Sequence, residues 1–381
     1  TTEIYTLSLH DALPISADNV YGGTGNAIDV DNDSDGTTTS VTTTGTVQST
    51  TGDGIYVRHF GADDVTVAAT NADGTATTTG NRSGIYVQNY GPSALSLTAD
   101  NVTGTTRYGV YTRNYPAGTD LTVTAYGTVT GYLTGIRALN YGIGDLTVSA
   151  SNADGTALVD GYLNGISVFH DYAGAIDVTA DNITSGLGIG VFANNTANGT
   201  GLSVTTYGTV TAFGQGMNLT HNGTGDLTVT AINSDGSASV TGTTGITADN
   251  NGTGALYITA DSVTGTASDG INANTSMSGT DLSVTTYGAG SGASDGINAV
   301  NNGSGNLTIL ASNAAGTASV TGTYYAIFAD NNNGGALSVT ADNATGTTYD
   351  AIAARNDASG TMLSVRTTGL ITGGVYGVEA R

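Results

Sequence analysis

The sequence contains no Cys, no Trp and no Lys, and only three of its 381 residues are Pro. Without Cys, neither disulfide bridges nor thiol chemistry can contribute to fold or function. All eight basic residues are Arg, against 31 acidic residues, which gives a net charge of −23. Because nucleic-acid binding needs clustered Lys and Arg, the composition argues against that class of function. No apolar run approaches the roughly 20 residues of a membrane-spanning helix.

The residues that are abundant are small and β-branched. Gly numbers 58, Thr is more frequent still, and 38% of the residues are hydrophobic. A Gly-rich chain is often disordered, but disorder also requires few apolar residues. Here Val, Ile and Leu recur at regular intervals, so the composition indicates a folded chain.

The chain is an internal repeat. A Gly or Ala followed by an apolar residue returns every 25 to 30 residues, in a longer pattern of three coils. Repetition at such a period is typical of solenoids. These marker residues, beginning with Ala27, continue at Gly54, Gly84, Gly109, Gly135, Gly165, Gly190, Gly216, Gly245, Gly270, Gly296, Ala326, Ala351 and Gly377.

Each coil holds three short segments separated by Gly, Asn and Asp. The first resembles GIYV (84–87), the second LTVTA (121–125), and the third is shorter and centres on a residue such as Val129. The second segment alternates apolar residues with Thr or Ser, which is typical of a strand with one buried face. The sequence therefore predicts an all-β, single-domain parallel β-helix over residues 16–381, with three strands per coil and about 13 coils. By analogy with most three-sided solenoids, we expect it to be right-handed.

A polar residue stands five positions after each marker. We interpret this polar column as a structural turn stack, since Asn hydrogen-bonds local backbone and stacked amides form ladders. The alternative, in which its His residues are metal ligands or general bases, is less favoured because they replace Asn at equivalent positions. The column comprises His59, Asn89, Asn114, Asn140, His170, Asn195, His221, Asn250, Thr275, Asn301, Asn331 and Asn356.

One segment is a weak candidate for calcium. Asp31, Asp33 and Asp35 precede Gly36 with the spacing of the first half of an EF-hand loop. The bidentate Glu that such a loop requires falls at Thr42, so an Asp-rich turn is the simpler interpretation. Other Asp-Gly and Asp-Asn pairs, such as Asp154-Gly155, are also interpreted as turns.

No coil concentrates ionisable residues, and the eight Arg are scattered, so we expect no enzyme, no cofactor and no catalytic residue. Two outer features remain open. Rows of Thr, such as Thr122 with Thr124, resemble the lattice of Thr-rich ice-binding solenoids, although Thr is also a good exposed strand residue. Tyr residues could stack on sugars or on another protein, or could pack along the solenoid's own turns. These are Tyr86, Tyr90, Tyr111, Tyr115, Tyr126, Tyr141 and Tyr207.

Residues 1–15, TTEIYTLSLHDALPI, share nothing with the repeat. They are similar to a translated short-read sequencing adapter, and we treat them as a non-native segment. We expect residues 16–381 to be a fragment that is open at both ends.

The repeats GIYVQNYGPSALSLTADNVTGT and GTDLTVTAYGTVTG, together with the absence of Cys, resemble passenger domains of bacterial autotransporters and related large β-helical adhesins. The resemblance implies a secreted or cell-surface location in a Gram-negative bacterium and a C-terminal membrane β-barrel in cis. It implies multivalent contact with a host surface, a glycan or like molecules. The alternatives are a freely secreted ice- or glycan-binding solenoid and, third, a β-helical polysaccharide-degrading enzyme.

Overall fold

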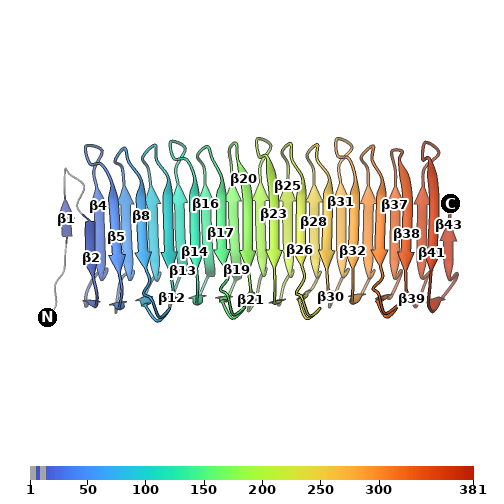
Figure 1. Ribbon diagram of the computed structural model, residues 1–381, viewed down its shortest axis with the longest axis horizontal. Helices are drawn as coiled ribbons and strands as arrows, with labels where there is room; N and C mark the ends of the chain where they lie inside the picture. Colours follow the sequence, from blue (N-terminus) through green and yellow to red (C-terminus); the bar gives the residue numbers. More distant parts are fainter. Residues whose placement is uncertain (1–5, 9–13) are drawn as a thin grey trace. The chain divides into compact units, whose positions relative to one another are not determined.

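The computed structural model describes residues 6–8 and 14–381. In this part of the chain the regular secondary structure consists of β-strands alone. The chain divides into two compact units, unit 1 (Thr1–Leu187) and unit 2 (Gly188–Arg381). Each unit consists of three parallel sheets, here called A, B and C, and each coil contributes one strand to each sheet (Figure 1). The predicted fold class, an all-β parallel solenoid with three strands per coil, is confirmed.

In unit 1, sheet A contains β1 (Thr6–Ser8), β4 (Ile28–Asn32), β7 (Ile55–His59), β10 (Ile85–Asn89), β13 (Tyr108–Asn114), β16 (Thr134–Asn140) and β19 (Asn164–His170). Sheet B contains β2 (Pro14–Ala17), β5 (Thr39–Thr43), β8 (Val65–Ala69), β11 (Leu95–Ala99), β14 (Leu121–Ala125), β17 (Leu146–Ala150) and β20 (Ala175–Ala180). Sheet C contains β3 (Val20–Gly22), β6 (Thr46–Ser49), β9 (Thr77–Gly80), β12 (Asn101–Gly104), β15 (Thr128–Gly131), β18 (Leu158–Gly161) and β21 (Asn182–Ser185).

In unit 2, sheet A contains β22 (Val191–Asn195), β25 (Met217–His221), β28 (Ile246–Asn250), β31 (Ile271–Thr275), β34 (Ile297–Asn301), β37 (Ile327–Asn331), β40 (Ile352–Asn356) and β43 (Val378–Ala380). Sheet B contains β23 (Gly201–Thr206), β26 (Leu227–Ala231), β29 (Leu256–Ala260), β32 (Leu282–Thr286), β35 (Leu307–Ala311), β38 (Ala336–Ala341) and β41 (Met362–Thr367). Sheet C contains β24 (Thr209–Ala212), β27 (Ser239–Gly242), β30 (Ser262–Gly265), β33 (Ala289–Gly292), β36 (Ser319–Gly322), β39 (Asn343–Gly346) and β42 (Ile371–Gly373).

Alternation along each strand builds the core. In β14, Leu121, Val123 and Ala125 are fully buried, whereas Thr122 and Thr124 between them are partly exposed. Successive strands pair in register, so each aliphatic column continues from coil to coil, as Leu95 pairs with Leu121 in sheet B. The interior is therefore a set of aliphatic columns, and each coil completes its burial against its neighbours.

The marker glycines lie where sheet C turns into sheet A. A Cβ atom at Gly109 would lie 2.6 Å from Val129 Cγ1 and 2.7 Å from the carbonyl oxygen of Gly135. This close approach explains why the marker column is mostly Gly.

Part of the segment that was set apart as non-native takes part in the solenoid. Pro14 and Ile15 belong to β2, which pairs with β5, and Thr6–Ser8 form β1, which pairs with β4. Residues 1–5 and 9–13 of that segment lie outside the described residues. Among the residues that the structure describes, no helix has the length and apolar character needed to cross a membrane.

Candidate functional site

The polar column lies at the C-terminal ends of the sheet A strands, facing the interior. Its members from His59 to Asn331 are at most 2% exposed, and Asn356 is partly exposed. Asn250 illustrates their role: its Oδ1 accepts a hydrogen bond from the Gly252 N–H at 3.2 Å, and its Nδ2 donates to the Ala255 carbonyl at 2.9 Å. The buried amide therefore closes the turn between sheets A and B.

Several members also bond to the equivalent residue of the next coil. The Nδ2 of Asn301 donates to Asn331 Oδ1 at 3.0 Å, and the Nδ2 of Asn331 donates to Asn356 Oδ1 at 3.0 Å. The Thr275 hydroxyl donates to Asn301. Elsewhere the amides bond mainly to turn carbonyls, as Asn114 to Thr119, Asn140 to Gly144 and Asn195 to Gly201.

The structure extends the column to Asn32, one coil before His59. Asn32 follows Ala27 by five residues, so the spacing rule could have identified it. Its Nδ2 lies 3.1 Å from His59 Nδ1, and the Thr39 hydroxyl lies 2.8 Å from the same nitrogen. The Asn32 amide, the Thr39 hydroxyl and the His59 ring therefore form one buried polar cluster at this turn.

His59 and His170 are four coils apart along the chain and His170 and His221 two, and no two of these three column histidines share a ligand geometry. Burial lowers the pKa of His59, against the opposing effect of the Asp63 and Gly61 backbone, and burial likewise lowers the pKa of His221 against Gly225. The Nε2 of His170 lies 2.8 Å from the Gly144 carbonyl oxygen. The burial of His59 and His221 thus favours the neutral imidazole in both.

The calcium candidates are not brought together. Asp31 points outward from β4 and forms an ion pair with Arg58 of the next coil. Asp33 and Asp35 lie in the turn that follows, where the Gly36 N–H donates to the Asp33 carbonyl at 2.9 Å. Within residues 6–8 and 14–381, no group of three His, Asp or Glu side chains is arranged to hold a metal ion.

Many of the acidic residues are hydrogen-bond acceptors for the backbone of the preceding coil. Asp342, which is 1% exposed, accepts from the Asn313 N–H at 3.0 Å and from the Ser312 and Thr368 hydroxyls, both at 2.8 Å. Asp181 holds Asn152 and Ala157 in the same way. Each pair of residues, 152 with 157 or 313 with 318, flanks a turn whose Gly has a φ near +67°. The Asp-Asn and Asp-Gly pairs are thus parts of one turn system.

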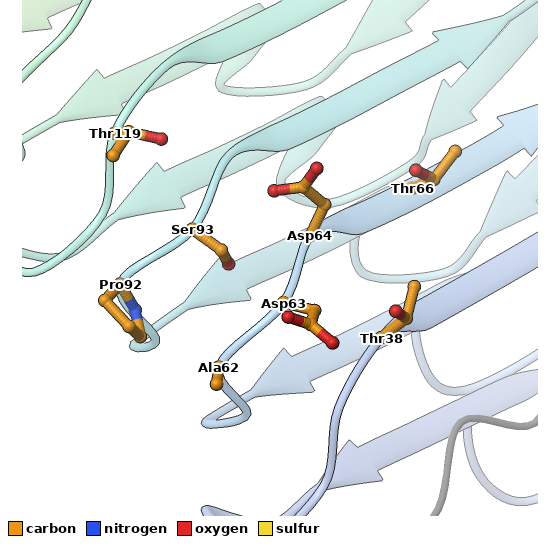
Figure 2. A pocket seen from close by; sticks show the side chains of 8 residues that line it. All are labelled: Thr38, Ala62, Asp63, Asp64, Thr66, Pro92, Ser93 and Thr119. Carbon is orange, nitrogen blue, oxygen red and sulfur yellow. The ribbon is translucent and has the colours of Figure 1, made fainter.

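A shallow groove of about 550 Å³ lies beside the turn that leads into β8 (Figure 2). Asp63 and Asp64 provide its carboxyl groups, and Asp64 accepts a hydrogen bond from the Ala94 N–H at 3.0 Å. The groove contains no nucleophile paired with a base. Its remaining lining residues are Thr38, Ala62, Thr66, Pro92, Ser93 and Thr119.

The outer side of sheet A in unit 1 carries two stacks of aromatic rings. Tyr56, Tyr86 and Tyr111 occupy equivalent outward positions, and Tyr86 stacks on both neighbours with ring centroids 5.4 and 4.5 Å apart. Just past the strand ends, Phe60, Tyr90 and Tyr115 form a second stack, with centroids 4.5 and 3.9 Å apart. We name this surface the aromatic–arginine face; it comprises Tyr56, Arg58, Phe60, Tyr86, Tyr90, Tyr111, Arg113, Tyr115, Arg137 and Tyr141.

Arginines are inserted among these rings. The Arg113 guanidinium carbon lies 4.2 Å from the Tyr115 ring centre and 4.6 Å from that of Tyr141, and Arg137 donates to the Tyr108 hydroxyl at 3.2 Å. Because the rings stack on one another, their faces are largely occupied, and edges and hydroxyls point outward. The interpretation in which Tyr residues pack along the solenoid's turns describes Tyr86, Tyr90, Tyr111 and Tyr115, whereas Tyr126 and Tyr207 are 48% and 44% exposed.

The corresponding face of unit 2 is mainly amide and hydroxyl. The positions equivalent to the tyrosine row include Asn218, Thr247, Asn272 and Asn298. Asn274 donates to Asp249 at 2.9 Å, and Arg355 lies over Phe328 at 5.0 Å. The same fold thus carries two chemically distinct faces in its two units.

From the sequence the Arg residues were interpreted as scattered, and the aromatic–arginine face was not identified. Two observations from the sequence could have found it. Tyr stands two residues after each of the markers Gly54, Gly84 and Gly109, and Phe or Tyr stands six residues after each of the four successive markers that begin with Gly54.

On sheet B, the Thr rows are in register, as Thr98, Thr124 and Ser149 pair in succession. Asp177 in unit 1, and Tyr257, Leu310 and Arg366 in unit 2, interrupt the rows.

Comparison of the chain with protein-family models, with curated proteins and with solved structures finds no match.

Proposed function

We propose that this chain is a structural and adhesive scaffold, exported from a Gram-negative bacterium to its surface or secreted, that makes multivalent contacts through its outer faces. The observation that supports this most directly is the engagement of its polar groups. Buried amides of the polar column and buried carboxylates bond to the solenoid's own turns, as Asn250 and Asp342 do. What remains for a partner is the repetitive outer surface.

Repetition suits weak contacts made in number. Equivalent side chains recur at each coil, at the strand spacing of about 4.8 Å. Linked contacts raise the overall affinity without a new contact of high energy, because each further binding event becomes intramolecular. A non-enzymatic role agrees with the groove beside β8, where Asp64 is engaged by backbone and no base adjoins a nucleophile.

The second candidate is a freely secreted ice-binding solenoid. The observation that favours it is the register of Thr98, Thr124 and Ser149 on sheet B. The interruptions at Tyr257 and Leu310 make this face less regular than an ice lattice requires, so we place it second.

The test compares single with multiple presentation. The full chain is measured in solution and coupled to beads, against a glycan array and against host-type cells, with thermal hysteresis and turnover on a polysaccharide panel measured in parallel. We expect binding that is weak in solution and much stronger on beads. Thermal hysteresis without surface binding would favour the ice-binding alternative, and turnover of a polysaccharide would replace the proposal by an enzyme.

A further inference from the structure

We propose that the aromatic–arginine face of unit 1 binds an acidic polysaccharide, a glycan chain whose sugar residues carry carboxylates. This inference rests on the adhesive role proposed above and assigns it a ligand class and a place.

The first argument is charge. The outward positions of β7, β10, β13, β16 and β19 contain Arg58, Arg113 and Arg137 but no carboxylate. In the part of the chain that the structure describes, no carboxylate lies within ion-pair distance of Arg113 or Arg137. Asp29 and Asp31 of β4 border this face and Asp31 pairs with Arg58, so Arg113 and Arg137 are the arginines of the face left for an acidic ligand. At physiological salt, charges beyond about 8 Å are largely screened, and the local arginines dominate the potential that a ligand meets there.

The second argument is hydrogen bonding. Tyr90 donates from its hydroxyl to that of Tyr115 at 3.0 Å, and Gln88 Nε2 donates to the same Tyr115 oxygen at 3.2 Å. The Tyr90 hydroxyl also lies 3.4 Å from Gln88 Oε1, so the two phenols and the Gln88 amide form one polar cluster beside the arginines. Hydroxyl and guanidinium donors side by side match carboxylates and hydroxyls, the groups that an acidic glycan offers together.

The third argument is spacing. The donors repeat from coil to coil at about 4.8 Å, which is close to the length of one sugar residue in an extended glycan. Tyr86, Tyr111 and Arg137 occupy one register row, and Tyr111 is only 7% exposed, so a chain laid along the row meets donors at Tyr86 and Arg137, on either side of the Tyr111 ring.

Unit 2 provides the matched control. Arg355 follows its marker by four residues, as Arg113 does. Its strand β40 lies between β37, where Asp330 pairs with Arg355, and β43, which contains Glu379, and it has no tyrosine stack beside it. Replacing either Arg removes the same charge, and only one replacement alters the proposed face.

The experiment measures binding of the full chain to polygalacturonate by calorimetry, with fully methyl-esterified polygalacturonate as the neutral polymer of the same backbone. We expect binding to the acidic polymer that weakens with added salt, weakens about tenfold in R113Q and in R137Q, and is unchanged in R355Q. Circular dichroism checks folding, and Tyr115→Phe, which keeps the ring stack, should also weaken binding.

Equal binding of the neutral polymer, or equal loss in R355Q, would overturn the inference. So would sedimentation showing that the face joins two copies of the chain and that the polymer does not compete. If the chain binds other glycans or cells but not the acidic polymer, the inference fails and the adhesive function stands. If it binds no surface at all, both fail.

Discussion

The side-chain nitrogen of Asn89 donates a hydrogen bond to the side-chain oxygen of Asn114 at 3.1 Å, although 25 residues separate them. Both side chains are fully buried, and Asn89 also donates to the Ser93 carbonyl at 2.8 Å and accepts from the Gly91 N–H at 3.0 Å. One amide thus closes its own turn and bonds to the next coil. A buried polar group of this kind stabilises the fold only while its partners are in place.

Asn250 and Asn251 allow this role to be measured on adjacent residues. Asn250→Ala leaves the Gly252 N–H and the Ala255 carbonyl without their buried partner, so we expect a loss of about 1–3 kcal/mol in the free energy of unfolding. Asn251→Ala removes an exposed bond to Asn222 and should change it by less than about 0.5 kcal/mol. Urea unfolding followed by circular dichroism gives both values, and equal losses would contradict the role assigned to the column.

The polar column and the strands were accessible from the sequence because they repeat along the chain. Alternation of Leu121 and Val123 with Thr122 and Thr124 predicts which face of a strand is buried. The fixed distance of five residues from each marker predicts which polar residue stands at the end of each sheet A strand. Equivalent residues in a solenoid stack, so one column read from the sequence is also a column in space.

The acceptor role of Asp342 and the aromatic–arginine face were less accessible, for a physical reason. Asp342 bonds to the N–H of Asn313 in one neighbouring coil and to the hydroxyl of Thr368 in the other, and spacing along the chain does not specify which groups a side chain meets in the coils beside it. The contact of Arg113 with Tyr141 depends on side-chain direction beyond the strand end, which periodicity does not specify.

Acidification should destabilise the fold through the column histidines. Burial lowers the pKa of His59 and of His221, so the folded state favours the neutral imidazole. The stability that this contributes is complete above the unfolded pKa of about 6.5 and is lost as the pH falls from there through the lowered folded pKa. The loss amounts to roughly 1.4 kcal/mol for each unit by which the pKa is lowered.

His59→Asn tests the cause, because Asn occupies the equivalent position in most coils. We expect the variant to fold and to lose part of the pH dependence of the urea midpoint below about pH 6.5. An unchanged pH profile in both His59→Asn and His221→Asn would show that other groups control this range.

The marker column contains a compensating pair that a double mutant can test. A Cβ at Gly296 would lie 2.4 Å from Val320 Cγ1, whereas in the next coil the two equivalent positions hold Ala326 and Ala344. We expect Gly296→Ala alone to cost about 1–3 kcal/mol through overpacking. Combined with Val320→Ala, it should cost less than the sum of the two single changes, because the smaller side chain makes room. Additive losses in a double-mutant cycle would indicate that the backbone, rather than Val320, excludes the methyl group.

Asp342→Asn should weaken the turn at Asn313. Burial raises the pKa of Asp342, but the hydrogen bonds from Asn313, Thr368 and Ser312 outweigh it and hold the pKa below its usual value. The carboxylate therefore contributes stability above about pH 4, lost as the pH falls through the lowered pKa. Asn replaces one acceptor oxygen by a donor facing other donors, so we expect a loss of about 1–3 kcal/mol at neutral pH. Asp154→Asn, in an exposed turn, is the control, and hydrogen exchange at Asn313 should rise only in the Asp342 variant.

Alkaline titration probes the tyrosine stack. Burial, followed by the hydrogen bond with Tyr115, raises the pKa of Tyr90 to about 12, and burial raises the pKa of Tyr86 as well. Since the folded state favours the protonated phenol, this contribution to stability is complete below the unfolded pKa of about 10 and is lost as the pH rises through the folded value. Spectrophotometric titration should therefore show a group of tyrosines that ionise only well above pH 10, reduced in Tyr90→Phe. If all tyrosines ionise together near the value of free tyrosine, the rings of unit 1 are not stacked in solution as the structure has them, because a solvated phenol would keep its ordinary pKa.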